Sequence, residues 1–93
     1  MKTFKHLTFK KREFGLVEYT GNQAKMFFKN GYGVSVITGF GAYGNESNPY
    51  EVAVIMKSGD GFEICYNTPI TDDVIGYCNK KDVTEIMKKV QEL

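Results

Sequence analysis

Apolar and polar residues alternate through the centre of the chain, and this period of two predicts β-strands. The alternating segments are 24–29, 32–38, 50–57 and 62–66. Asn30-Gly31 separates the first two, and Asn-Gly in such a place is the strongest short-range hairpin signal, because both residues tolerate the positive φ of a type I′ turn. Residues 58–61, Ser-Gly-Asp-Gly, predict the turn between the last two. We predict an antiparallel β-meander of four strands, or of five with a short strand over 15–19, preceded by an edge strand or ordered arm.

The alternation also assigns side chains to the two faces of this sheet, because residues two apart share a face. One face is apolar throughout and is expected to form the core: Met26, Phe28, Val34, Val36, Val52, Val54, Met56, Phe62 and Ile64. The opposite face carries charged residues and also five apolar ones, which are Phe27, Ile37, Ala53, Ile55 and Cys65. We expect a second layer or a partner to cover part of this outer face.

A helical period replaces the alternation at the C-terminal end of the chain. Five apolar residues fall at i, i+3, i+4, i+7 and i+10 and so form one stripe: Val83, Ile86, Met87, Val90 and Leu93. Asn79 is a suitable N-cap, and Asp82 stands three residues later, where a capping box has its acid. We predict an amphipathic helix from about Lys80 that packs on the apolar face and completes a single α+β domain over residues 1–93.

The segment before this helix contains Pro69, which ends the last strand because proline has no N–H to give to the ladder. Thr71, followed by Asp72 and Asp73, has the pattern of a cap and first turn. We therefore predict a short helix here that ends near Gly76.

The charges nearly cancel over the whole chain but are unevenly distributed along it. The formal net charge of +1 argues against a polyanion that imitates nucleic acid and against a strongly basic nucleic-acid binder. Residues 1–31 nevertheless carry a sum of +5, and residues 32–93 a sum of −4. This dipolar distribution, together with the partly apolar outer face, predicts a homo-oligomer, most simply a two-fold dimer.

Cys65 and Cys78 are the only cysteines, and the single histidine cannot complete a zinc site with them. No apolar run is long enough for a signal peptide or for the roughly 20 residues of a membrane span. We expect free thiols, a cytoplasmic protein without membrane association, and no metal or other cofactor.

The run Gly39-Phe40-Gly41-Ala42-Tyr43-Gly44 matches the G-x-G-x-x-G dinucleotide fingerprint. The next predicted element is a strand, however, and not the helix that the fingerprint requires. We interpret the segment from Gly39 to Pro49 as a long hairpin loop, and long loops on rigid sheets often carry binding sites. Phe40, Tyr43 and Tyr50 are its candidate contact residues.

Asp72, Asp73 and Tyr77 are further candidate binding residues, because neither the alternation nor the helical stripe requires these side chains. A catalytic pair of carboxylates is not expected, since neighbouring residues at a helix start point about 100° apart. His6 has no Ser, Cys or acid at a spacing that indicates catalysis. We expect no enzymatic activity.

The N-terminal arm supports an alternative function. Lys10-Lys11-Arg12 is interleaved with Phe4, Phe9 and Phe14, and aromatic rings stack on single-stranded bases while lysines hold phosphates. A solvated basic edge that resists aggregation explains the same residues. A nucleic-acid-binding module therefore stays open as a second interpretation. The third interpretation is a nucleotide-binding sponge, that is, a protein that sequesters a nucleotide signal by binding its phosphates at a Gly loop or a helix N-terminus.

Three stretches of the sequence carry a family resemblance: Asn-Gly-Tyr-Gly-Val-Ser-Val at 30–36, Cys-Tyr-Asn-Thr-Pro-Ile-Thr-Asp-Asp-Val-Ile-Gly-Tyr at 65–77, and Asp-Val-Thr-Glu-Ile-Met-Lys-Lys-Val-Gln-Glu-Leu at 82–93. Together they resemble a family of short proteins encoded by tailed bacteriophages and prophages. The resemblance implies a setting, the cytoplasm of the infected bacterium, and supplies no catalytic residues. Small phage proteins commonly act by binding, so we expect an accessory protein that neutralises a host or antiviral-defence component.

Overall fold

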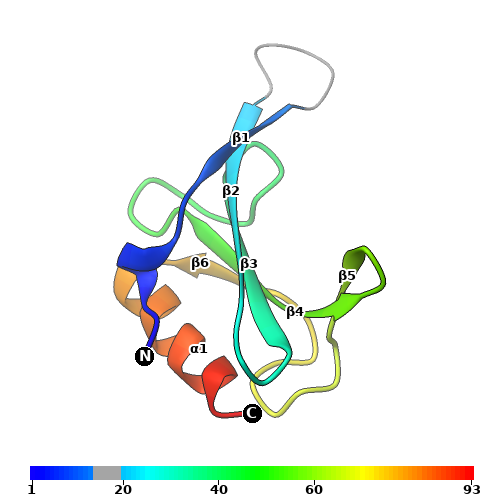
Figure 1. Ribbon diagram of the computed structural model, residues 1–93. Coiled ribbons are helices and arrows are strands. Elements are labelled where there is room, and N and C mark those ends of the chain that lie inside the picture. Colours follow the sequence, from blue (N-terminus) through cyan, green and yellow to red (C-terminus); the bar gives the residue numbers. More distant parts are fainter. Residues whose placement is uncertain (14–19) are drawn as a thin grey trace.

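The computed structural model describes residues 1–13 and 20–93, which form one 3₁₀ turn, six strands and one α-helix (Figure 1). In chain order the elements are η1 (Phe4–His6), β1 (Lys10–Glu13), β2 (Thr20–Phe27), β3 (Tyr32–Gly39), β4 (Tyr50–Ser58), β5 (Gly61–Ile64), β6 (Ile75–Cys78) and α1 (Lys80–Gln91). The strand predicted over 15–19 lies outside the described residues.

The sheet is an antiparallel meander in which β1 to β5 follow one another in chain order. β6 joins this sheet by pairing with β4. One edge of β4 is therefore shared, because β5 pairs with residues 55–58 and β6 pairs with Tyr50 and Val52. The predicted α+β architecture is confirmed, and β6 is an addition that the alternation did not reveal.

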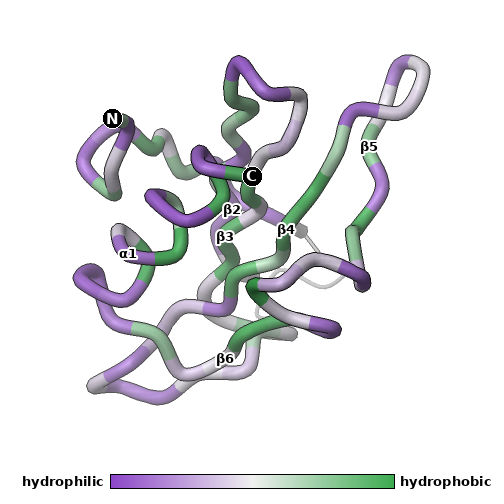
Figure 2. Tube along the Cα trace, turned by 90° about the horizontal axis from the view of Figure 1, so that it is seen from below, coloured by the Kyte–Doolittle hydropathy of each residue, from purple (hydrophilic) through white to green (hydrophobic). Residues whose placement is uncertain are grey.

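The helix α1 covers one face of the sheet with its apolar stripe (Figure 2). The buried core between the two layers comprises Val34, Val36, Val52, Val54, Cys78, Val83, Ile86, Met87 and Val90. The predicted capping box is present, since Asp82 N donates to Asn79 Oδ1 at 2.8 Å and Asn79 N donates to Asp82 Oδ2 at 2.9 Å. The helix begins at Lys80, as its cap predicts.

The turn between β2 and β3 differs from the predicted type I′ turn. Gly31 N donates to Phe28 O at 3.1 Å and Phe28 N donates to Tyr32 O at 2.7 Å, so the loop has three residues. Gly31 has a φ of 89° whereas Asn30 keeps a negative φ, as in a type I turn followed by a glycine bulge. The physical reason is a tertiary contact: Asn30 Nδ2 donates to Val90 O at 2.9 Å, at the C-terminal end of α1.

The side chains of β5 lie on the opposite face of the sheet from the one that the alternation predicted. The two-residue loop after Ser58 pairs Lys57 with Phe62 and Ile55 with Ile64. Phe62 and Ile64 therefore lie on the outer face and are exposed, although the alternation placed them in the core. A shift of one residue moves every side chain of a strand to the other face.

Cys65 and Met56 also differ from their predicted positions. Cys65 N donates to Val54 O at 2.8 Å, and the side chain packs against the core instead of lying on the outer face. Met56 was assigned to the core but is exposed.

The predicted short helix from Thr71 to Gly76 is not formed. Asp73 N donates to Thr71 Oγ1 at 3.1 Å, and this local bond belongs to a bend from which β6 begins two residues later. Ile75 and Cys78 then pack against the core, and that burial favours a strand over a solvated helical turn.

The chain itself covers part of the outer face of the sheet. Ile55 is completely buried there although it faces away from α1. Lys25 Nζ lies 4.8 Å from the centroid of the Phe62 ring, and Lys57 Nζ lies 5.3 Å from the centroid of Phe27. Lysine stems and aromatic rings thus shield the middle of this face.

Candidate functional site

The loop between β3 and β4 lies against β6, which brings two of the predicted contact residues together. Tyr77 N donates to Tyr43 O at 2.8 Å. Tyr43 N in turn donates to Glu51 Oε1 at 3.0 Å, so β4 also holds the loop. These bonds fix the backbone at both tyrosines.

Gly76 permits this close approach. A Cβ atom at position 76 would lie 2.7 Å from Tyr43 Cβ, a separation that real Cβ atoms do not show. The glycine is therefore required by the packing of the loop, which the sequence alone did not indicate.

Tyr77 has a φ of 55°, and it is the single non-glycine residue with positive φ in residues 1–13 and 20–93. The irregular pairing of β6 explains this conformation. Ile75 and Cys78 pair with Val52 and Tyr50 across a register shift, and both pack against the core although they are three residues apart. The extra residue forms a bulge, which turns Tyr77 outward.

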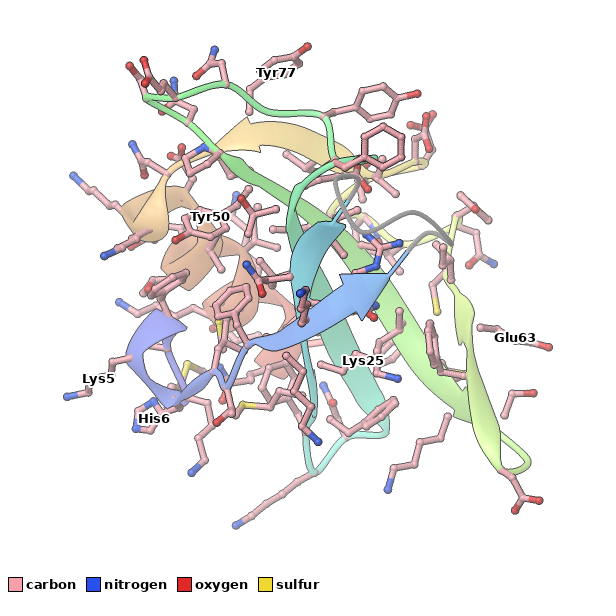
Figure 3. All side chains as sticks on the ribbon, turned by 90° about the horizontal axis from the view of Figure 1, so that it is seen from above. Lys5, His6, Lys25, Tyr50, Glu63 and Tyr77 are labelled. Carbon is pink, nitrogen blue, oxygen red and sulfur yellow. The ribbon has the colours of Figure 1, made fainter. Side chains whose placement is uncertain are left out.

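The side chains of Phe40, Tyr43 and Tyr77 are exposed by 49%, 64% and 58%, and we call these three the loop–β6 surface. Figure 3 shows Tyr77 at the periphery of the molecule. Phe40 precedes Tyr43 by three residues in the loop, where Ala42 N donates to Gly39 O at 3.1 Å. Exposed aromatic side chains on a hydrogen-bonded backbone are typical of binding surfaces.

Tyr50 lies apart from this surface. Its ring centroid is 5.1 Å from that of Phe4 and 5.8 Å from that of Phe9 (Figure 3). The three rings form a half-buried cluster that holds the N-terminal segment on the core. This packing explains the tyrosine without a ligand.

Asp72 and Asp73 are exposed in the segment before β6. No helix begins at these residues, so their expected capping role does not apply. In the described part of the chain neither carboxylate forms an ion pair. Both are therefore available to a basic group of a partner.

Among the described residues of the N-terminal arm, the aromatic side chains do not form an exposed stacking surface. Phe4 and Phe9 pack against the core, while Phe14 lies outside the described residues. Lys10 and Lys11 are exposed on β1, at the edge of the sheet. Charged side chains on an edge strand oppose pairing with another sheet.

The two cysteines are unfavourable nucleophiles. Burial raises the pKa of the Cys78 thiol, and the Asp82 carboxylate raises it further. Burial and the Glu63 carboxylate also raise the pKa of Cys65. Because the thiolate is the reactive form, these shifts lower the reactivity of both sulfur atoms.

Among residues 1–13 and 20–93, no three His, Cys, Asp or Glu side chains are placed to hold a metal ion. No helix in this part of the chain is long and apolar enough to cross a membrane. Comparisons with protein-family models, curated proteins and solved structures gave no match.

Proposed function

We propose that this chain is a non-enzymatic phage accessory protein that binds and neutralises a host or antiviral-defence protein through the loop–β6 surface. The observation that carries the proposal is Tyr77, an exposed aromatic side chain on a left-handed backbone. That conformation costs a residue other than glycine about 1–2 kcal/mol. Backbone strain of this kind concentrates at functional sites.

The chemistry of the surface suits a protein partner. Tyrosine and phenylalanine rings offer large contact areas, and the rotamer entropy lost on binding is small because each has two χ angles. Such residues are typical hot spots in protein interfaces. Asp72 and Asp73 add unpaired carboxylates on the segment that leads into β6, where they favour a partner with exposed Arg or Lys side chains.

The loop is also ordered before any partner binds. Asn48 N donates to Asn45 Oδ1 at 2.8 Å, and Asn45 N donates back to Asn48 O at 3.1 Å. With the bonds at Tyr43, these contacts restrict the backbone on both sides of the aromatic residues. A preorganised loop loses less conformational entropy on association, which favours affinity.

The phage setting and the cytoplasmic location rest on the sequence resemblance and remain part of the proposal. The homodimer is also a proposal, supported by the half-buried Phe27 and Ile37 and by the uneven charge distribution. Ile55 does not contribute to such an interface, because it is completely buried within one chain. Light scattering at high micromolar concentration distinguishes dimer from monomer.

Affinity capture from bacteria that express the tagged protein tests the proposed function. We compare the wild type with a Tyr43→Ala/Tyr77→Gly double variant and with Tyr66→Ala, a control whose side chain is 55% exposed outside the loop–β6 surface. A protein that the wild type and the control capture, and the double variant loses, supports the proposal. If every captured protein is retained by the double variant, the surface is not the binding site.

A further inference from the structure

A pocket of about 560 Å³ lies at the other end of β3 from the loop–β6 surface. The N-terminal segment, the turn between β2 and β3 and the last turn of α1 form its walls. In Figure 1 the N-terminus lies beside the C-terminal half of α1. Ligand pockets in proteins typically have volumes of about 300–1,000 Å³, so this one accommodates a small molecule.

Hydrogen bonds join the three walls. Gln91 Nε2 donates to Lys2 O at 2.8 Å, and Lys2 N donates to Gln91 Oε1 at 2.9 Å. Phe4 N donates to Thr84 Oγ1 at 3.1 Å on the same helix. On the other side, Asn30 Nδ2 joins the β2–β3 turn to Val90 O. The pocket is therefore formed without a ligand.

The charged groups of the pocket favour an anion. Lys2 and Lys29 line it, no Asp or Glu does, and neither lysine forms an ion pair with any described residue. His6 adds a donor: its Nδ1 accepts from Thr3 N at 3.0 Å, which leaves Nε2 to carry the ring proton. Figure 3 places His6 beside Lys5 on the N-terminal segment.

The C-terminal end of α1 opposes this preference but does not outweigh it. A helix C-terminus acts as a partial charge of about −0.5, whereas the two lysines contribute two full positive charges. The helix carbonyl groups of Met87 and Val90 are moreover hydrogen-bonded by the side-chain amides of Gln91 and Asn30. The two lysine charges therefore exceed the partial charge of the helix end.

Aromatic surface completes the site. Phe28 is half-buried and lines the pocket, whereas the ring of its neighbour Phe27 lies on the outer face of the sheet, beside Lys57. Phenylalanine rings stack on nucleobases, and lysines hold phosphate as point charges. From this juxtaposition we propose that the pocket binds a nucleoside phosphate, with the base against the Phe28 ring and the phosphate between Lys2 and Lys29. The proposal is independent of the loop–β6 surface.

Nuclear magnetic resonance titrations with AMP, adenosine and inorganic phosphate test the site. AMP should shift the backbone amide signals of residues 2–6 and 27–31 and bind at least about tenfold more tightly than adenosine or phosphate. Lys2→Ala and Lys29→Ala should each weaken AMP binding about tenfold. Lys81→Ala, which removes the same charge at the other end of α1, should change it less than about twofold.

Three results would overturn the proposal. The first is the absence of shifts in these amides at about 10 mM AMP, a concentration that detects even millimolar affinity. The second is equal affinity for AMP and adenosine, which would show that the lysines do not hold the phosphate. The third is equal loss of affinity in Lys29→Ala and Lys81→Ala. Amide spectra recorded before the titration show whether each variant is folded.

Discussion

The backbone strain at Tyr77 can be measured by replacing this residue with glycine and, separately, with alanine. Both changes remove the ring, so its lost contacts cancel when the two variants are compared. Alanine retains the cost of the left-handed conformation, about 1–2 kcal/mol, and glycine does not. Glycine instead loses about 0.5–1 kcal/mol more in backbone entropy on folding. We therefore expect Tyr77→Gly to be more stable than Tyr77→Ala by about 0.5–1 kcal/mol.

Urea unfolding followed by circular dichroism measures this difference. For a domain of this length, 1 kcal/mol corresponds to about 4–8 °C in melting temperature, so thermal unfolding gives a second measure. Glu63, an exposed residue of β5, provides the matched control because its φ is not positive. There the order should reverse, with alanine more stable than glycine by about 0.5–1 kcal/mol. If alanine were also the more stable residue at position 77, the strain that supports the proposed function would not exist.

Three further changes test contacts that shape the fold. Asn30→Ala removes the hydrogen bonds to Val90 O and Tyr32 N and should cost about 1–2 kcal/mol in urea unfolding, whereas the exposed Asn67→Ala should cost less than about 0.5 kcal/mol. Gly76→Ala should lower the free energy of unfolding by about 1–3 kcal/mol, because the added Cβ would collide with Tyr43. The control is Gly61→Ala, whose Cβ would lie 3.9 Å from the nearest atom and should change the free energy of unfolding by less than about 1 kcal/mol. The third change concerns pH. The pKa of Cys78 is raised in the folded protein, so the unfolded chain ionises first and stability should fall as pH rises above about 8.5. Cys78→Ala should flatten that dependence, and an unchanged slope would refute the pKa argument.

The parts of the fold that the sequence predicted are those with a regular period. The alternation of 32–38 and 50–57 identified β3 and β4, and the row of Val34 and Val54 lies under the helix as expected. The stripe from Val83 to Val90 and its capping box identified α1. In each case the period of apolar residues within one element determines which of its side chains are buried. The element and its buried face can therefore be predicted from that stretch of sequence alone.

The parts that it did not predict depend on contacts between distant residues. The face on which Phe62 lies is set by a two-residue turn, and a period of two fits either register. β6 was missed because Asp72 and Asp73 after Thr71 favour a helix start locally, while pairing with β4 prevails in the folded chain.

The candidate site likewise contains residues that the sequence could predict and residues that it could not. Tyr43 and Tyr77 were selected because no regular period required them, and the structure places their backbones in contact. Tyr50 was selected for the same reason but packs against Phe4, a residue 46 positions away that no local pattern could connect to it. The pocket beside Lys2 and Gln91 had no signal in the sequence, because its walls meet only in the folded chain.

The central claim is that the loop–β6 surface binds a protein, and the affinity of Tyr77→Gly for the captured partner tests it most directly. Calorimetry on purified proteins compares this variant with the wild type, with Tyr43→Ala and with the Tyr66→Ala control. We expect Tyr77→Gly and Tyr43→Ala each to lose about 1–3 kcal/mol of binding free energy, roughly 5- to 150-fold in Kd. The control should bind as the wild type does, and all variants should remain folded. Wild-type affinity in Tyr77→Gly, or an equal loss in the control, would contradict the account.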